Sequence, residues 1–302
     1  MSKYLITIVG PTAIGKTALA IQIAQHYKTE ILSGDSRQFY KEMSIGTAVP
    51  SSEELQTAPH HFIQHLSIED SYSIGHYERD AIQLLEHVFK QHQFVVLVGG
   101  SGLYIDAVLE GLDTFPPVKA GIRESLTTLY HKEGVGALQQ LLKEKDPVYY
   151  ARVDLNNHQR MIRALEVCLS TDSPFSSFQK KTKATRDFEV IKIGIHADRS
   201  LLYDRINKRV DQMINAGLVE EARNLLSRKH LNALQTVGYR ELFMHFEDQY
   251  TLDEAIDKIK INTRRFAKRQ LTWYRRDTHI EWFDYTTQIS AYLSYIQKKA
   301  SS

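Results

Sequence analysis

The stretch Gly10-Pro-Thr-Ala-Ile-Gly-Lys-Thr17 decides the fold of this 302-residue chain. It matches the spacing G-x-x-x-x-G-K-[ST], in which backbone N–H groups and the N-terminus of the next helix surround phosphate oxygens. A β-branched run, Tyr4–Val9, precedes the stretch, and apolar residues at helical spacing follow it over Lys16–Tyr27. A glycine-rich turn that only capped a helix would need neither Lys16 nor Thr17. We therefore predict a loop that binds a diphosphate or a triphosphate.

Each residue of this loop is a candidate ligand of the phosphates. Lys16 would place a positive charge on the terminal phosphate, and the Thr17 hydroxyl can ligate Mg²⁺. The backbone of the loop supplies the remaining donors, so the predicted binding set is Gly10, Pro11, Thr12, Ala13, Ile14, Gly15, Lys16 and Thr17.

Other apolar runs alternate with helical patterns and predict an α/β fold. Strands are expected at 30–33, 94–98, 190–195 and 280–283, and helices at 77–89, 201–216, 219–227 and 252–276, with a frayed Ser/Lys-ended tail. Such alternation predicts a parallel sheet flanked by helices, with ligands bound beyond the carboxyl ends of the strands.

An inserted domain is predicted where Pro116-Pro117 interrupts the alternation. The pattern is helical from Ile122 to about Ser170, and the polar stretch from Ser170 to Arg186 is typical of a return linker. We expect an α/β core at residues 1–115 and 186–302 and a helical insertion at 116–185.

Composition narrows the class of protein. The net charge is only +2, so binding of nucleic acid would have to come from a local basic patch. Cys168 is the single cysteine, which excludes an internal disulfide framework and any Cys-rich zinc site; it is expected in the core. Neither a signal-peptide pattern nor an apolar run long enough for a membrane span is present, so we expect a soluble cytoplasmic protein.

Asp35 is the carboxylate that follows the second predicted strand. It could accept a proton from an incoming nucleophile, hold Mg²⁺ through water, or cap a helix. Its position places it in the crevice of the phosphate loop, which favours a functional role. Kinases and nucleotide-hydrolysing enzymes normally add an apolar strand that ends in Asp. Here that strand is followed by Gly99-Gly-Ser-Gly102, which weakens the interpretation of the protein as a kinase or a nucleotide-hydrolysing enzyme.

A long basic helix is predicted near the C-terminus. From Lys258 to Arg276 there are eight basic residues and no acidic one. At helical spacing Ile256, Ile259, Phe266, Ala267 and Trp273 share one face, and all the basic residues except Lys260 lie opposite. A solvated face usually alternates Glu with Lys, so the stripe favours a phosphate backbone as partner.

His60, His61 and His65 do not form a predicted metal site, because no cysteine or carboxylate stands at ligand spacing from them. They are expected to be structural or to face RNA.

Several blocks, taken in order, resemble the tRNA dimethylallyltransferases. They are Gly10–Thr17, Asp35–Gln38, Gly46–Ala48, Pro59–His61, Gly99–Tyr104, Gln159–Glu166, Leu202–Met213, Val237–Glu241 and Arg264–Trp273. The resemblance covers nearly the whole chain, and several of the blocks are rare outside this family.

The resemblance implies a P-loop NTPase-like fold adapted to prenyl transfer. Dimethylallyl diphosphate would place its diphosphate in the loop, with Mg²⁺ on Thr17, and the dimethylallyl group would move to N6 of adenosine 37 in tRNAs that read codons beginning with U. Asp35 aligns with the residue taken as general base. Lys16, Arg205 and Arg209 are candidates to stabilise the departing diphosphate, with surface salt bridges as the alternative for the two arginines.

The resemblance also implies an interface with the tRNA anticodon stem-loop, whose target base is flipped into a channel. The implied contacts are Asp35, Ser36, Arg37, Gln38, Ser101, Arg123, Gln159, Arg160, Met161, Ile162 and Arg163, joined by Arg264 and Lys268 of the basic helix. Ser101 replaces the usual Thr and keeps the hydroxyl, so it is included in the catalytic set. At three positions the sequence departs from the residues common in the family: Ile14 replaces Ser, Val49 replaces Lys and Gln64 replaces Asp. The resemblance also implies a monomer.

Three other functions remain open at this point. The protein could prenylate free adenine nucleotides, although the basic helix and the Gln159–Arg163 stretch suit a larger acceptor. It could be an ATP-dependent small-molecule kinase, which the loop alone supports. It could be an RNA-binding module with a vestigial loop, which the intact Lys16, Thr17 and Asp35 oppose.

Overall fold

A computed structural model describes residues 2–179 and 182–301, which form two compact units. The core unit comprises Met1–Glu110 and Thr185–Ser302, and the insertion unit comprises Gly111–Ala184. These limits lie within a few residues of the expected ones. Residues 180 and 181 of the predicted linker lie outside the described residues.

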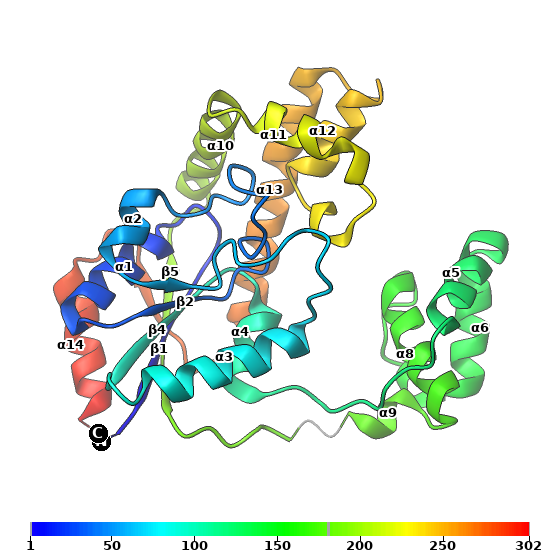
Figure 1. Cartoon of the computed structure of the whole chain (residues 1–302), viewed down its shortest axis with the longest axis horizontal. Coiled ribbons are helices and arrows are strands. Elements are labelled where there is room, and N and C mark those ends of the chain that lie inside the picture. Colours follow the sequence, from blue (N-terminus) through cyan, green and yellow to red (C-terminus); the bar gives the residue numbers. More distant parts are fainter. Residues whose placement is uncertain (1, 180–181, 302) are drawn as a thin grey trace. The chain divides into compact units, whose positions relative to one another are not determined.

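The core unit is built on a six-stranded sheet in the order β3-β2-β4-β1-β5-β6, in which every paired neighbour is parallel (Figure 1). The strands are β1 (Tyr4–Val9), β2 (Ile31–Ser33), β3 (His60–His61), β4 (Phe94–Val98), β5 (Glu189–His196) and β6 (Glu281–Asp284). In the centre, Ile6 of β1 lies opposite Val96 of β4 and Ile191 of β5. The predicted parallel α/β sheet is confirmed; β3, with two residues, is too short to leave a sequence pattern.

Helices cover both faces of this sheet. The helices of the core unit are α1 (Lys16–Tyr27), α2 (Ser52–Thr57), α3 (Ile74–Val88), α4 (Gly102–Glu110), α10 (Arg199–Asn215), α11 (Leu218–Leu225), α12 (Tyr239–Phe246), α13 (Leu252–Tyr274) and α14 (Ile289–Ala300), with short 3₁₀ turns at Leu226–Arg228 and Asn232–Leu234; α11 and α12 pack on α10 and α13. Because strand side chains alternate, Ile6 packs in one cluster with Ile23 of α1, and Leu5 packs in the other with Leu85 of α3. Within the described residues, no helix has the length and apolar character that crossing a membrane requires.

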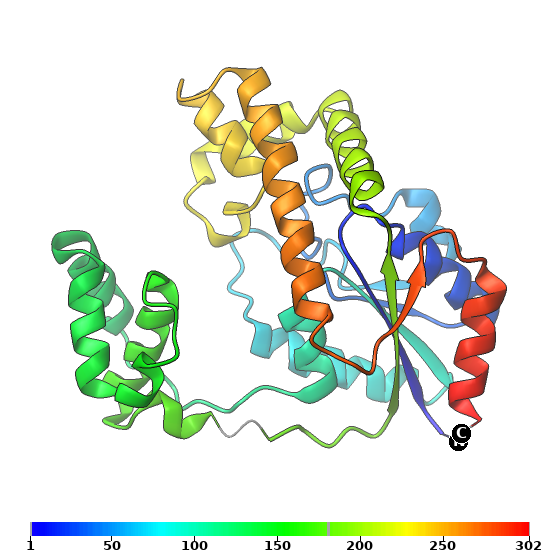
Figure 2. The ribbon, with the colours of Figure 1, turned by 180° about the vertical axis from the view of Figure 1, so that it is seen from behind.

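The C-terminal tail is an ordered helix, so the expectation that it would fray was wrong. Helix α14 packs against α1, beside which it lies in both ribbon views (Figures 1 and 2). Tyr292 and Ile296, four residues apart, are fully buried in the α1 cluster. The Ser and Lys residues that suggested fraying stand only at its end.

Helix α13 carries the basic stripe and runs alongside α10 and α12 (Figure 2). A capping box of Thr251 and Glu254 begins it. Ile259 and Ala267 are buried as expected, but Phe266 is 37% exposed, so its assignment to the buried face was wrong. Phe266 instead faces a cavity described below.

The insertion unit is helical, as predicted. It contains α5 (Ile122–Glu133), α6 (Val135–Lys145), α7 (Pro147–Tyr150), α8 (His158–Thr171) and α9 (Phe175–Phe178). Its own apolar core includes Leu138, Leu165 and Cys168, which confirms Cys168 as a packed core residue. The short helix α9 lies within the stretch that was predicted as a linker. Phe175 anchors it, because this side chain is buried against Phe115, with the two ring centres 4.7 Å apart.

Candidate functional site

The loop between β1 and α1 has the shape that the sequence predicted. Gly15 has φ 112°, a conformation open mainly to glycine, and it turns the chain into α1. Ala13 has φ 64°, which is uncommon for a residue with a side chain and is found where backbone geometry serves a ligand. The loop is therefore held in a strained arrangement at the carboxyl end of the central strand.

A cavity of about 540 Å³, here called the phosphate cavity, opens over this loop. Its lining includes the loop from Thr12 to Thr17, Asp35, Gln38, Val49, Gly100, Arg205, Lys208 and Arg209. Four cationic side chains thus line one cavity, three of them from α10. The sequence analysis did not identify Lys208, although it lies on the same helix as Arg205 and Arg209.

The charges in the phosphate cavity favour an anionic ligand. Lys16 donates from Nζ to the Pro11 carbonyl oxygen at 2.8 Å. Burial lowers the pKa of Lys16 to about 8; the Asp35 carboxylate opposes this shift, and the Arg209 guanidinium adds to it. Burial also lowers the pKa of Arg209, opposed by Asp35 and reinforced by Arg205. Two carboxylates, Asp35 and Glu54, line the cavity against four cations, so positive charge remains that a bound diphosphate would neutralise.

Arg205 supports the loop directly. Its Nε donates to the Ala13 carbonyl oxygen at 2.8 Å, and its guanidinium lies 5.8 Å from the centre of the Tyr285 ring. Both Arg205 and Arg209 line the phosphate cavity, where they could contact a bound diphosphate.

A second cavity, of about 330 Å³, adjoins the first and is here called the side cavity. Its apolar lining residues are Ile206, Val210, Met213, Leu218, Val237, Ile259 and Phe266. Its polar and charged lining residues include Ser36, Arg37, Ser101, Arg240 and Arg269. The two cavities share Thr12, Asp35, Thr47, Ala48 and Arg209. They consequently meet at Asp35.

Asp35 sits on a tight turn that follows β2. Its Oδ1 accepts a hydrogen bond from the Arg37 N–H at 3.1 Å, and its carbonyl oxygen accepts from the Gln38 N–H at 3.0 Å. Residues 36–39 form turns and not a helix, so the alternative of a helix N-cap was wrong. The turn is pressed against the strand-end glycines, because a Cβ on Gly99 would lie 2.5 Å from the Gly34 carbonyl.

The other residues of this turn line the cavities and also fix neighbouring loops. Ser36 donates from its backbone N–H to Ser101 Oγ at 3.1 Å, so the two hydroxyl residues lie together. Gln38 donates from Nε2 to the Ala48 carbonyl at 2.9 Å. Arg37 donates from one nitrogen to the carbonyl oxygens of Asn232 and Ala233, each at 2.9 Å, and burial lowers its pKa.

Glu221 is a supporting residue that the sequence did not reveal. Its carboxylate accepts the backbone N–H groups of Ser44, Ile45 and Gly46 at 3.0, 2.8 and 2.9 Å, and the Tyr239 hydroxyl at 2.6 Å. This holds the loop that brings Thr47 and Ala48 to both cavities. The backbone partners of Glu221 are 175 to 177 residues away along the chain, so no local pattern could have shown them.

The residues at the loop fit a magnesium ion shared with phosphates. Among residues 2–179 and 182–301 no group of three or more His, Cys, Asp or Glu could hold a metal, so a protein-only metal cage is not formed there. Mg²⁺ commonly takes one or two protein oxygens together with phosphate oxygens and water. Thr17 lines the phosphate cavity and can provide such an oxygen.

The histidines have structural partners. His61 Nε2 lies 2.6 Å from the Glu30 carboxylate, and His60 Nδ1 lies 2.7 Å from the Ala58 carbonyl oxygen. Gln64, a departure from the family, donates to Ser44 Oγ at 2.6 Å and so also supports a loop. Ile14 is buried in the core, and Val49 lines the phosphate cavity.

The basic stripe of α13 borders the side cavity. Lys268 and Arg269 are exposed, and Arg269 also lines that cavity. Arg264 donates to Asn207 Oδ1 at 2.7 Å and lies 5.6 Å from the Tyr203 ring centre. Lys260, which the sequence placed off the stripe, pairs with Asp211 at 2.6 Å.

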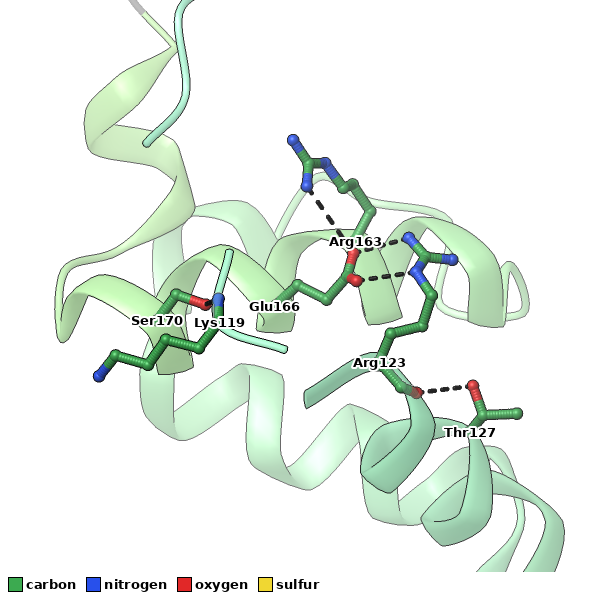
Figure 3. A network of polar contacts seen from close by, with 6 residues as sticks. All are labelled: Lys119, Arg123, Thr127, Arg163, Glu166 and Ser170. Atoms are coloured by element: carbon green, nitrogen blue, oxygen red, sulfur yellow. Dashed lines mark hydrogen bonds and ion pairs between the residues drawn. The ribbon is translucent and has the colours of Figure 1, made fainter. Parts of the chain in front are cut away.

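In the insertion unit one buried carboxylate orients two arginines (Figure 3). Glu166 accepts from Nε and Nη2 of Arg123 at 2.7 and 2.6 Å, and Arg163 Nη1 lies 3.8 Å away. The Glu166 side chain is 4% exposed, whereas that of Arg123 is 60% exposed. The bidentate pair therefore holds Arg123 rigidly at the surface.

The Gln159–Arg163 stretch is divided between surface and core. Gln159 and Arg160 are exposed on α8. Met161 and Ile162 are buried in the core of the insertion unit, at 0% and 4% exposure, so the expectation that their side chains touch RNA was wrong. Helical periodicity turns these two residues inward.

Comparison with known proteins places the chain in a family. A family model described as IPP transferase matches residues 38–277. The tRNA dimethylallyltransferase of Christiangramia forsetii is 55% identical over the full length of both chains, and that of Flavobacterium johnsoniae is 54% identical over 99% of each. The crystal structure of a tRNA isopentenylpyrophosphate transferase from Bacillus halodurans is 36% identical, with a TM-score of 0.72 over 99% of this chain and 96% of that one. The chain belongs to the IPP transferase family.

Proposed function

We propose that this protein transfers the dimethylallyl group of dimethylallyl diphosphate to N6 of adenosine 37 in tRNAs that read codons beginning with U, releasing diphosphate. The observation that carries the proposal is the place of Asp35, which lines both the phosphate cavity and the side cavity. A donor in the first cavity and an acceptor base in the second would bring their reacting atoms together beside this carboxylate.

The donor end of the site suits a diphosphate. Lys16, Arg205, Lys208 and Arg209 line the phosphate cavity, and the pKa of Lys16 is lowered because burial is not offset by enough negative charge. A bound Mg²⁺, held by Thr17 and phosphate oxygens, would supply further stabilisation of the leaving diphosphate. From the phosphate cavity the dimethylallyl group would reach the adjoining side cavity, whose apolar lining residues, such as Ile206, suit a hydrocarbon at the place where the acceptor base enters.

The chemistry requires one proton acceptor and one site for the leaving charge. The N6 nitrogen forms a bond to the allylic carbon while the bond from that carbon to the diphosphate oxygen breaks. Asp35 accepts the proton that N6 loses, because an exocyclic amine is a poor nucleophile while it holds both hydrogens. The electron pair of the broken bond leaves on the diphosphate, where Lys16 and Arg209 stabilise it. Ser101, bonded to Ser36 beside Asp35, would orient the base.

The acceptor end of the site suits RNA. An adenine stacked in an anticodon loop hides N6, so it must be flipped out to reach Asp35. Arg269 lines the side cavity, and the exposed Lys268 precedes it on α13; both would hold the phosphate backbone while a base enters. Arg123 and Arg160 of the insertion unit offer further phosphate contacts. We expect the protein to act as a monomer in the cytoplasm.

The proposal is tested with labelled dimethylallyl diphosphate and a set of acceptors. These are an unmodified tRNA with adenosines on both sides of adenosine 37, the same tRNA with guanosine at that position, AMP, and ATP. We expect label only in the first. Label in AMP would assign the protein to the prenylation of free nucleotides, and label in the guanosine variant would move the modified base elsewhere. Consumption of ATP on a small acceptor without prenyl transfer would assign it to the kinases.

A further inference from the structure

Gln270 on α13 is a polar side chain in the interior of the core unit, where it is 5% exposed. Its Nε2 donates to the Gly100 carbonyl oxygen at 2.9 Å, and its Oε1 accepts from the Thr12 backbone N–H at 2.8 Å. One side chain thereby joins α13, the phosphate loop and the turn that follows β4. Its two partners are 170 and 258 residues away along the chain.

The two partners fix the chemistry that this position requires. A backbone N–H must meet an oxygen, and a backbone carbonyl must meet a donor, so the amide can adopt only one orientation. Glutamate would offer two acceptors and no donor when ionised, and methionine would offer neither. Either exchange would therefore leave backbone groups of the site without a hydrogen-bond partner. A buried polar group in that state costs more free energy than a hydrogen bond contributes.

Both partners of Gln270 belong to the site. Thr12 lines both cavities, and Gly100 lines the phosphate cavity. A Cβ built on Gly100 would lie 2.4 Å from Gln270 Nε2 and 3.5 Å from Asp35 Oδ2, so the amide fills the space directly behind the turn beside Asp35. Gln270 itself lines neither cavity and so would act through the backbone segments that it holds.

The same helix carries the groups that face outward. Phe266 and Arg269 line the side cavity, and Lys268 and Arg269 belong to the exposed basic stripe. Gln270 follows them directly and points into the interior. Helix α13 is therefore hydrogen-bonded through Gln270 to the phosphate loop, and it also borders the side cavity through Phe266 and Arg269.

We propose that Gln270 is a positioning residue for the donor: it holds the phosphate loop at Thr12 and the Gly100 turn in the arrangement that binds the diphosphate. This rests on the proposed function for the identity of the donor. The link is specific to an amide of this length, and it acts on diphosphate binding and not on RNA binding.

The test compares Gln270→Met with Gln22→Met, the same exchange at an exposed position of α1. Five quantities are measured: the Kd for inorganic pyrophosphate with Mg²⁺ by calorimetry, the KM for dimethylallyl diphosphate, kcat, the Kd for tRNA, and the melting temperature. In Gln270→Met we expect the pyrophosphate Kd and the KM for the donor to rise about tenfold or more. The tRNA Kd should stay close to that of Gln22→Met, while the melting temperature should be lower, because two buried backbone groups lose their partner.

Gly100→Ala approaches the same bond from the other side, because its new methyl group displaces the amide of an unchanged Gln270. We expect it to raise the same two constants, and it decides the question if Gln270→Met does not fold. Unchanged pyrophosphate Kd and donor KM in the folded variant would overturn the proposal. So would a fall in kcat alone, which would indicate only a smaller folded fraction. If the wild type binds pyrophosphate but transfers no prenyl group, the proposed function fails while the pyrophosphate measurement still tests Gln270.

Discussion

Lys16 should make diphosphate binding depend on pH between about pH 7 and 9. Burial lowers its pKa to about 8 in the empty cavity, with Asp35 opposing the shift. A bound diphosphate places negative charge against the ammonium group and raises that pKa again. Binding above pH 8 must therefore be accompanied by uptake of a proton, and the affinity must fall as the pH rises through this value.

The size of the effect follows from the protonated fraction. With a pKa of about 8, roughly nine tenths of Lys16 is charged at pH 7 and roughly one tenth at pH 9. If only the charged form binds, the affinity for pyrophosphate falls about tenfold between these pH values. Below pH 7 the contribution of this group should be constant, because Lys16 is then fully protonated.

Calorimetry can measure both quantities. Mg²⁺-pyrophosphate is titrated into the protein from pH 7 to 9, in two buffers with different heats of ionisation, which gives the Kd and the number of protons taken up. Lys16→Met is the control, because it lacks the ammonium group but sees the same ionisation of pyrophosphate. An identical pH slope in the wild type and in Lys16→Met would refute the assignment of this titration to Lys16.

Three further predictions concern RNA binding and folding. Replacing Arg264 and Lys268 by Gln should weaken tRNA binding and flatten its dependence on salt, with the pyrophosphate Kd unchanged; a salt slope equal to that of the wild type would leave the helix a structural role. Glu166→Gln should loosen Arg123 and lower tRNA affinity several-fold in a filter-binding assay, and equal affinity would show that this pair does not serve RNA. Gly46→Ala should lower the free energy of unfolding in urea by about 1–3 kcal/mol, because its Cβ would lie 2.6 Å from the buried Tyr239 ring; an unchanged midpoint would contradict this.

The sequence was most informative where a structure is determined by neighbouring residues. The loop from Gly10 to Thr17 could be read because its spacing, the strand before it and the helix after it all lie within a short stretch. The central strands were confirmed for the same reason, since β1 and β4 are continuous apolar runs bounded by turn residues. The position of Asp35 at a strand end was enough to place it beside the loop.

Side-chain direction was harder to predict than helix position. Met161 and Ile162 belong to a block that resembles an RNA-binding stretch, yet both point into the insertion core. Phe266 is apolar and was assigned to the buried face, yet it faces the side cavity. In each case the deciding factor is what packs against the helix, which local spacing does not specify.

The supporting contacts of the site could not be predicted at all. Gln270 and Glu221 bond to segments that are more than a hundred residues away. Their distant partners are backbone N–H and carbonyl groups, so no residue type in the sequence marks them. Only the folded chain shows that a glutamine on the basic helix holds the phosphate loop.

The role of Asp35 as the base can be tested most directly by its replacement. Wild-type protein and Asp35→Ala are incubated with unmodified tRNA, Mg²⁺ and dimethylallyl diphosphate, and the RNA is digested to nucleosides for mass spectrometry. We expect prenylated adenosine with the wild type and a yield lower by on the order of a hundredfold or more with Asp35→Ala, at nearly equal tRNA affinity. Equal yields would remove Asp35 as the base, and the absence of prenylated adenosine with the wild type would contradict the proposed reaction.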